Sequence, residues 1–304
     1  MSYKTPILFA VLSGLLFCID SETELFRYVG YALGAIALLC IIEDVSPYGR
    51  FLCLKASFKI RGIRVYTKDP KVARHMGALK NSPKFLNYVN GLDTKNHTIS
   101  SIEIERVTMF GPTNVGFVYM TVSCVTLKQN PKTNKKTTIP GVVFLRGDSV
   151  ATFITIKNKQ SGKYYCLLVS QYRVPIGKYI HELVAGMLDK QTGDPTGKML
   201  DEVYEETGIK LKKNDLSKLG VITLSPGGCD EKMDLFYTGL ELDDDKIKRI
   251  LSKTYGQENE GEEISLQLVA LSDLSNMFGR SLTDAKLLST IPLLPPHIRK
   301  MIGY

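Results

Sequence analysis

The chain has 304 residues and a formal net charge of +8, with 44% hydrophobic and 23% charged residues. This is the composition of a globular protein, and the length suffices for one large or two modest domains with a sizeable core. The basic residues are scattered, and no stripe of them alternates with aromatic residues, so we expect no nucleic-acid partner. An overall positive field fits an anionic, phosphate-bearing ligand better.

Cysteine and histidine are not arranged as metal ligands. None of the six cysteines has CxxC spacing, and Cys18 and Cys40 lie in apolar stretches. We therefore expect buried free thiols in a reducing compartment, rather than a disulfide framework or a zinc site. The four histidines show no HxH or HExxH spacing, which argues against a His-based metal centre.

The first fifty residues differ in character from the rest of the chain. Two apolar runs, 6–19 and 28–42, flank an acidic loop at 20–24. Each run is shorter than the roughly 20 residues that span a bilayer, but basic residues flank the pair on both sides. We therefore predict an apolar helical hairpin at residues 1–50. It associates with a membrane through residues 6–42 and leaves the rest of the chain on the cytosolic side.

Two alternatives stay open for this segment. It could direct the chain to an organelle, although no convincing cleavage site follows the first run. It could also supply buried helices to a soluble cytoplasmic domain.

From about residue 56 the chain changes to short runs with strand character. Residues 100–109 alternate apolar and polar side chains, residues 115–127 are rich in β-branched and aromatic residues, and residues 129–138 form a polar, turn-rich loop. Further strands are predicted at 141–145, 150–156, 164–169, 219–223, 232–240 and 263–269. We expect a β-rich N-terminal domain at 56–146 and a second domain at 147–304.

Two helices are predicted within the second domain. The first covers residues 196–207, because Pro195 precedes it and Gly208 can supply a left-handed C-cap. The second covers residues 283–290, which open with a Thr-Asp pair of N-cap type. Strands with intercalated helices indicate an α/β sandwich.

The first helix carries a cluster of acidic residues. Spacings of three and four place Glu202 beside Glu205 and Glu206 on one helix face. Like charges at this distance repel, and a divalent cation among them removes the repulsion. Hard cations such as Mg²⁺ take oxygen ligands and share their shell with substrate phosphates. The alternative is a solvated acidic face, which is common on helices.

Residues 186–209 resemble the Nudix box, GX5EX7REUXEEXGU, and residues 202–209 match its second half. Other segments resemble the ADP-ribose and ADP-sugar pyrophosphatase branch of that family, and the likeness is closest to plant-type ADP-sugar diphosphatases over roughly residues 95 to 292. These segments are QYRVP at 171–175, ELVAGM at 182–187, SPGGCDE at 225–231, EGEEI at 260–264 and DAK at 284–286.

The resemblance implies a Nudix α/β/α sandwich with a mixed sheet. It also implies that the β-rich domain acts as a dimerisation element, so that the protein is a homodimer. The implied reaction is Mg²⁺-dependent hydrolysis of the diphosphate of an ADP-sugar, of ADP-ribose or ADP-glucose type, to AMP and a sugar phosphate. Mn²⁺ is a possible replacement for the metal. The alternatives are a weakened, nucleotide-sugar-binding pseudoenzyme at a membrane, and a Nudix enzyme for another nucleoside diphosphate derivative.

The resemblance also assigns roles to individual residues. The metal ligands are Glu202, Glu205, Glu206, Glu262 and the carbonyl of Ala185. The catalytic base is Glu262 or, less favoured, Glu260. The substrate-binding residues are Arg173, Glu182, Gly227 and Gly228. Arg173 could instead form a structural salt bridge, Glu182 could be structural, and the two glycines could make a plain tight turn.

The chain departs from the family pattern at two positions. The position of the first box glutamate holds Gly193, next to Asp194. By resemblance, the plant-type branch shares this feature. The resemblance implies that the box arginine orients the metal-binding carboxylates through a salt bridge. In this chain it is replaced by Asp201, which places a negative charge beside Glu202. Either Lys198, one turn before Glu202, supplies the missing positive charge, or metal affinity and rate fall.

Overall fold

The computed structural model describes residues 56–188, 194–256, 262–278 and 283–304. The apolar segment predicted at 1–50, the box position Gly193 and the second candidate base Glu260 lie outside the described residues. Within those ranges, no helix has the length and apolarity needed to cross a membrane. Residues 57–304 form one compact unit that contains two β-sheets.

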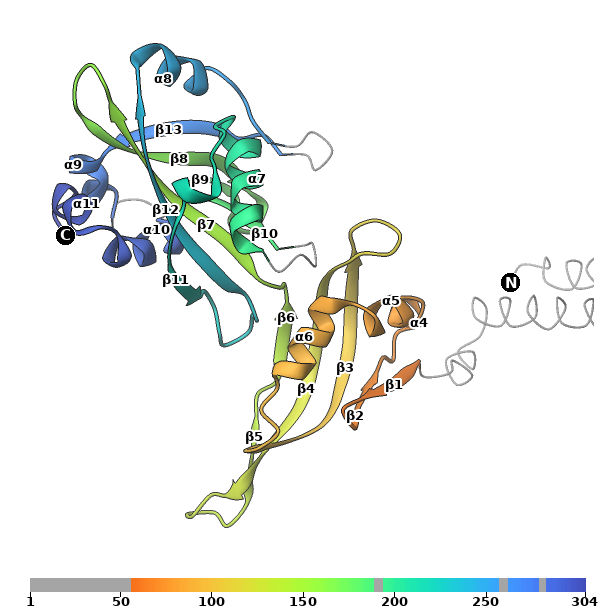
Figure 1. Cartoon of the computed structure of the whole chain (residues 1–304). Coiled ribbons are helices and arrows are strands. Elements are labelled where there is room, and N and C mark those ends of the chain that lie inside the picture. The colour runs from red at the N-terminus through yellow and green to blue at the C-terminus, as the bar shows by residue number, and fades with distance from the viewer. Residues whose placement is uncertain (1–55, 189–193, 257–261, 279–282) are drawn as a thin grey trace, which may run out of the picture. The chain divides into compact units, whose positions relative to one another are not determined.

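The first sheet has six strands in the order β1-β2-β3-β4-β5, with β6 also paired to β4 (Figure 1). The β2–β3 pair is parallel and the other pairs are antiparallel. The strands are β1 (Ser57–Ile60), β2 (Ile63–Tyr66), β3 (His97–Met109), β4 (Val115–Gln129), β5 (Lys136–Ile139) and β6 (Val142–Leu145). The strands predicted at 100–109, 115–127 and 141–145 correspond to β3, β4 and β6.

Three short helices that we did not predict lie between β2 and β3 in the chain. They are α4 (Pro70–Ala73), α5 (Met76–Lys80) and α6 (Pro83–Gly91). A proline at the first helical position starts α6, because its fixed φ suits the helix and its missing N–H would have no intrahelical partner. Phe85 of α6 is buried and packs edge-to-face on Phe58 of β1, with ring centroids 6.3 Å apart. The β-rich region therefore also contains a helical segment.

The second sheet has seven strands in the order β11-β12-β7-β8-β13, with β10 paired to β7 and β9 to β8. It is mixed, because β12 runs parallel to β7 while the other pairs are antiparallel. The strands are β7 (Ser149–Asn158), β8 (Tyr164–Arg173), β9 (Lys178–Glu182), β10 (Val184–Met187), β11 (Ser217–Thr223), β12 (Lys232–Leu242) and β13 (Ser265–Ala270).

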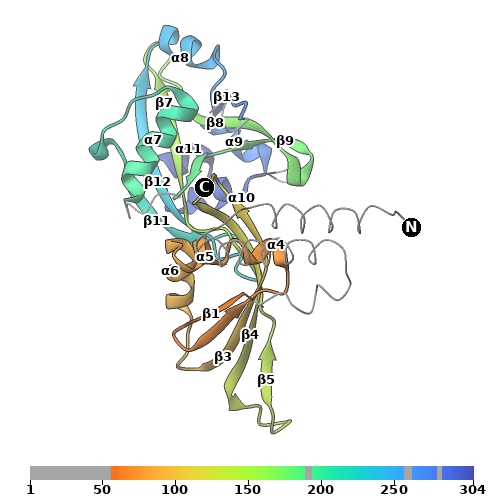
Figure 2. The same ribbon diagram turned by 90° about the vertical axis from the view of Figure 1, so that its right-hand side faces the viewer.

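Helices cover both faces of the second sheet (Figure 2). On one face, Met199 and Val203 of α7 (Pro195–Thr207) and Ile247 of α8 (Asp244–Leu251) join a buried cluster with Val150 and Ile154 of β7. The opposite face is covered by the C-terminal helices α9 (Leu271–Leu274), α10 (Ala285–Thr290) and α11 (Pro296–Ile302). This is the α/β/α sandwich with a mixed sheet that we predicted.

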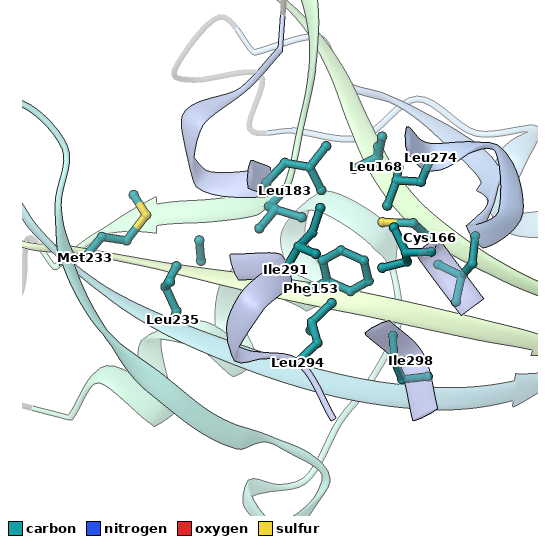
Figure 3. Close-up of a cluster of buried hydrophobic side chains, with 14 residues drawn as sticks. Phe153, Cys166, Leu168, Leu183, Met233, Leu235, Leu274, Ile291, Leu294 and Ile298 are labelled. Carbon is teal, nitrogen blue, oxygen red and sulfur yellow. The ribbon is translucent and has the colours of Figure 1, made fainter. Parts of the chain in front are cut away.

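The C-terminal helices bury a second cluster against the sheet (Figure 3). Phe153 of β7 lies at its centre, and Leu168 of β8, Leu274 of α9 and Ile298 of α11 surround it. The alternation of β7 explains both clusters, because successive side chains of a strand point to opposite faces. Val150 and Ile154 therefore face α7, whereas Phe153 faces the C-terminal helices.

Within the described ranges the remaining elements are four short 3₁₀ helices, η1 (Val174–Ile176), η2 (Lys213–Asp215), η4 (Ser275–Met277) and η5 (Ile291–Leu293). The predicted helices at 196–207 and 283–290 are present as α7 and α10. The chain passes from the first sheet to the second between Leu145 and Ser149, and a domain boundary at residues 146–147 stays a prediction.

Candidate active site

Helix α7 positions the acidic residues. Its N-cap, Asp194, accepts a hydrogen bond from the Gly197 N–H at 3.1 Å and pairs with Lys213 at 2.7 Å, and Gly208 ends the helix in the left-handed conformation. The face that packs on the sheet carries Glu202 and Glu206, which are 8% and 7% exposed. The neighbouring Glu205 is half-buried, whereas Asp201 is exposed on the outer face.

Glu202 is held by two neighbours. Its Oε1 lies 2.5 Å from Nζ of Lys198, one helical turn earlier. It also lies against Gly186 of β10, where a Cβ atom would stand 1.9 Å from Cδ and Oε1 of Glu202. A side chain at 186 therefore has no room beside this carboxylate. Burial raises the pKa of Glu202, Lys198 opposes the shift, and the charges of Glu205 and Glu262 add to it.

Glu206 lies one turn after Glu202 on the same face. Burial raises the pKa of Glu206 well above its usual range, and the charges of Glu202 and Glu262 act in the same direction. A backbone hydrogen bond from Ala185 and the charge of Arg173 oppose these effects. Among the described residues, Oε2 of Glu206 is buried without a hydrogen-bond partner. Such an atom destabilises the fold unless a proton or an external cation satisfies it.

Glu262 approaches this face from the segment that leads into β13. Tyr255 and Ile264 close the base of that loop through two backbone hydrogen bonds of 2.8 and 2.9 Å. Gly256, at φ +102°, has a backbone conformation that favours glycine, and a Cβ there would stand 2.8 Å from Cβ of Glu262. The backbone of Glu262 thus lies closely against Gly256. Its charge raises the pKa of both buried glutamates of α7, so the three carboxylates share one electrostatic environment.

We refer to Glu202, Glu205, Glu206 and Glu262 as the acidic cluster. In the part of the chain that the structure describes, no three His, Cys, Asp or Glu side chains are grouped as ligands around a common point. The acidic cluster is therefore a set of electrostatic neighbours rather than a closed ligand shell. Divalent cations bound by one or two carboxylates keep positions for water and substrate phosphates, and this arrangement fits that type of site.

The candidate substrate residues Arg173 and Glu182 belong to a network of charged side chains. Nε and Nη2 of Arg173 lie 2.9 and 2.6 Å from Oε2 of Glu182. Nζ of Lys286 lies 3.5 Å from Oε1 of Glu182 and 3.0 Å from Oδ1 of Asp284. Oδ2 of Asp284 accepts a hydrogen bond from the Leu183 N–H at 3.3 Å. The network therefore ties β9 to the start of α10.

The network favours different roles for its two predicted members. Glu182 is buried and has a cation at each carboxylate oxygen, which favours the structural interpretation of this residue. Arg173 forms the structural salt bridge that was one of its two interpretations. Its side chain is nevertheless 41% exposed, so the guanidinium can also meet an anion from solvent.

Gly227 and Gly228 lie in a turn next to the first sheet. The N–H groups of Gly228 and Cys229 donate to the carbonyl of Ser225 at 3.2 and 2.9 Å, and the Gly228 carbonyl accepts from Phe144 of β6 at 2.7 Å. A Cβ atom at either glycine would meet nothing within 4 Å. The structure therefore does not pack these glycines against the acidic cluster, and the open space leaves both predicted roles possible.

Sequence reasoning missed Lys286 and Asp284. The DAK segment was recognised as a point of family resemblance, but no role followed from it. Asp284 is 6% exposed, and a buried acidic residue beside a lysine is a signal of an ion network. Lys286 contacts Glu182, which lies 104 residues earlier in the chain, a distance over which spacing rules carry no information.

Comparison with known proteins identifies the family, although no family model matches the chain. The chain is 35% identical over 228 residues to Nudix hydrolase 14, chloroplastic, of Arabidopsis thaliana, and the alignment covers 70% of each protein. The chain belongs to the Nudix hydrolase family. The resemblance seen in residues 186–209 is therefore a family relationship, and the protein is a Nudix hydrolase.

One further relative and one solved structure are similar to the chain over different lengths. An ADP-ribose pyrophosphatase of Bacillus subtilis (strain 168) is 34% identical over 96 residues, which is 29% of this chain and 50% of that protein. A crystal structure of an ADP compounds hydrolase aligns with a TM-score of 0.45 and 16% identity, over 67% of this chain and 94% of that one.

Proposed function

We propose that this Nudix hydrolase cleaves the diphosphate of an ADP-sugar, of ADP-ribose or ADP-glucose type, to AMP and a sugar phosphate. The observation that carries the proposal is the acidic cluster, in which buried Glu206 has a carboxylate oxygen with no partner among the described residues. Two similar proteins, a Nudix hydrolase and an ADP-ribose pyrophosphatase, support this class of substrate by their names.

The residues present fit a divalent cation, for which we propose Mg²⁺, with Mn²⁺ as a possible replacement. Glu202, Glu205, Glu206 and Glu262 would hold it, because hard cations take carboxylate oxygens. In a strand, the N–H and C=O of one residue point to the same edge. The backbone N–H of Ala185 donates a hydrogen bond to Glu206. The Ala185 carbonyl therefore points from β10 toward Glu206 as well, and it can serve as a further ligand of the cation. When bound, the cation neutralises phosphate charge and acidifies a water molecule.

The protein's own residues then complete the reaction. Glu262 accepts a proton from the attacking water, whose oxygen forms a bond to one phosphorus atom. The bridging P–O bond breaks, and the leaving phosphate carries away its electron pair. A carboxylate suffices as the base because the water it faces is already acidified. Arg173 binds the diphosphate through its exposed guanidinium.

The test is hydrolysis of ADP-ribose and ADP-glucose by the purified full chain with Mg²⁺. Glu262→Gln is expected to lower kcat by about 10²- to 10⁴-fold, as for other general bases. Its matched control is Glu263→Gln, which alters an exposed neighbour and should retain wild-type turnover. Equal rates for wild type and Glu262→Gln would exclude this residue as the base. Tight binding of ADP-ribose without turnover by wild type would instead identify a nucleotide-sugar-binding pseudoenzyme.

We also propose that the protein is a homodimer in which the first sheet provides the contact. Phe110, Tyr119 and Val142 of this sheet region are 39%, 42% and 72% exposed, and large apolar side chains of this kind are typical of interfaces. Light scattering of wild type and Val142→Lys tests the idea. A wild-type monomer, or a dimer that Val142→Lys leaves intact, would argue against a contact through this sheet.

For the N-terminal segment we propose membrane association through residues 6–42, with organelle targeting as the alternative. The relative in Arabidopsis is named a chloroplastic protein, which supports the alternative. Fusion of residues 1–55 to a fluorescent protein, followed by carbonate extraction of isolated membranes, separates the two. An extractable, processed fusion inside an organelle would exclude the anchor.

A further inference from the structure

The family's box arginine position holds Asp201, and this side chain is exposed on the outer face of α7. The next residue, Glu202, is buried on the inner face, where it contacts Gly186. Asp201 therefore does not occupy the place of an orienting cation, and its charge is directed to solvent. The acidic cluster needs its orienting cation from another position.

Lys198 occupies that position in the structure. Its Nζ lies 2.5 Å from Oε1 of Glu202, and the two side chains are only 25% and 11% exposed. An ion pair screened this little by water is stronger than an exposed pair of the same length. The printed contact of the pair is with Oε1 of Glu202, which places the lysine charge directly at this carboxylate. Lys198 thereby restricts the orientation of the carboxylate.

The placement of Lys198 is unfavourable for the helix itself. A lysine in the first turn opposes the positive end of the helix dipole, and a lysine that precedes its glutamate by four residues gives the weaker order of such a pair. Helix stability therefore does not account for this lysine. The first turn is also held in place by Asp194, which receives hydrogen bonds from the backbone of Gly197 and the side chain of Lys213. This anchoring gives Lys198 a defined approach to Glu202.

We propose that the charge which orients Glu202 has moved from the box arginine position to Lys198, one turn earlier on α7. The proposal rests on the proposed function, because it assigns Lys198 as a positioning residue for a metal-binding carboxylate. The helix thus tolerates Asp201 because another residue performs the task of the missing arginine.

The experiment measures Mn²⁺ affinity by calorimetry on the full chain without substrate, together with thermal unfolding in the absence of metal. Lys198→Met is expected to weaken Mn²⁺ binding about 10- to 100-fold, the usual effect of losing a residue that orients a ligand. Lys198→Arg should remain close to wild type. The matched control is Lys246→Met, which removes an exposed lysine from the first turn of α8.

The outcomes separate this proposal from the proposed function. Unchanged Mn²⁺ binding by Lys198→Met overturns the proposal, because Lys198 would then have no effect on the metal site. Tighter binding also overturns it, because the charge of Lys198 would then repel the cation. A folded Lys198→Arg variant that loses as much affinity as Lys198→Met also overturns it, because retaining the positive charge would then not preserve the orientation of Glu202. If Glu206→Gln binds Mn²⁺ as wild type does, or wild type binds none, the metal site itself is misassigned. If Lys198→Met does not fold, Lys198→Gln and Lys198→Arg give the same comparison.

Discussion

Nζ of Lys286 lies 3.5 Å from Oε1 of Glu182, although 104 residues separate them in the chain. This contact connects the C-terminal helices, which cover one face of the second sheet, to the strand that carries a candidate substrate residue. Glu182 in turn pairs with Arg173, the proposed ligand of the diphosphate. The C-terminal segment therefore contributes to the geometry of the site as well as to the core.

Lys286→Met should destabilise the protein and weaken substrate binding. The substitution leaves buried Glu182 with one cation instead of two, and breaking a buried ion pair costs about 3–5 kcal/mol. The loosened Glu182 holds Arg173 less firmly, so KM for ADP-ribose is expected to rise while kcat falls less. Urea denaturation and steady-state kinetics measure the two effects. Lys248→Met, on the exposed face of α8, is the control, and an equal loss of stability in both variants would contradict the prediction.

Gly186→Ala should reduce turnover far more than stability. The new Cβ would stand 1.9 Å from Oε1 of Glu202, so this carboxylate must move. A displacement of about 1 Å at a catalytic group costs on the order of 10²-fold in rate. The measurement is kcat with Mg²⁺, alongside the midpoint of thermal unfolding.

Gly77→Ala is the matched control for that experiment. Gly77 lies in α5, is exposed, and would place its Cβ in open space. Alanine there should stabilise the protein by about 0.4–1 kcal/mol, because it restricts the unfolded chain without straining the helix. Unimpaired turnover of Gly186→Ala would show that the position of Glu202 is not critical.

The parts of the site that sequence could predict are those encoded locally. Helical periodicity placed Glu202, Glu205 and Glu206 on neighbouring faces, and the same rule brought Lys198 beside Glu202. The family resemblance added Glu262, whose electrostatic contact with α7 comes from a segment more than fifty residues away. Family membership of the chain is confirmed, whereas the roles of the individual residues stay predictions.

The parts that sequence did not predict depend on tertiary contacts or on weak local signals. We predicted a β-rich region that includes Pro70 to Gly91, where the structure has three helices. Their sequence signals are weak because the helices are short and a few buried residues such as Phe85 decide their packing. Helix α8 was also missed. Its signals were present, since Asp243 caps it, acidic residues occupy its first turn and basic residues its last. The Lys286 network joins residues too distant in sequence for any spacing rule.

A divalent cation should stabilise the wild-type protein but not Glu206→Gln. Without metal, the substitution removes a buried group whose negative charge is disfavoured by burial and by Glu202 and Glu262, so the variant should be more stable than wild type. Mg²⁺ at 100 times its Kd should stabilise wild type by about 2.7 kcal/mol. Differential scanning fluorimetry with and without EDTA measures both effects. Exposed Glu263→Gln is the control, and a metal-induced shift that survives in Glu206→Gln would place the cation elsewhere.

Stability should decrease on mild acidification because of His181 in β9. Burial lowers the pKa of His181, and its Nδ1 is buried without a hydrogen-bond partner among the described residues. As the pH falls below the unfolded-state pKa of about 6.5, the unfolded chain binds a proton that the native state does not. Stability is therefore lost from that pH down to the lowered pKa of the folded state, and it is retained above pH 6.5.

The corresponding measurement is the urea midpoint at several pH values between 5 and 8 for wild type and His181→Gln. The variant lacks the titrating group, so its midpoint should change less over this range. His297→Gln, an exposed substitution on α11, should follow the wild-type curve. Parallel curves for wild type and His181→Gln would show that other groups govern the acid sensitivity.

The pairing of β10 with β7 sets Ala185 opposite Ala151 and Gly186 opposite Val150. Because side chains alternate along a strand, a shift of this pairing by one residue would turn the small residues away and present a larger side chain to Glu202. A single-residue insertion or deletion inside β10 would thus disable the enzyme while every charged group of the site remained in the chain. On the proposed assignment of the glutamates, the number of residues in this short strand is as much a requirement for catalysis as the identity of the glutamates.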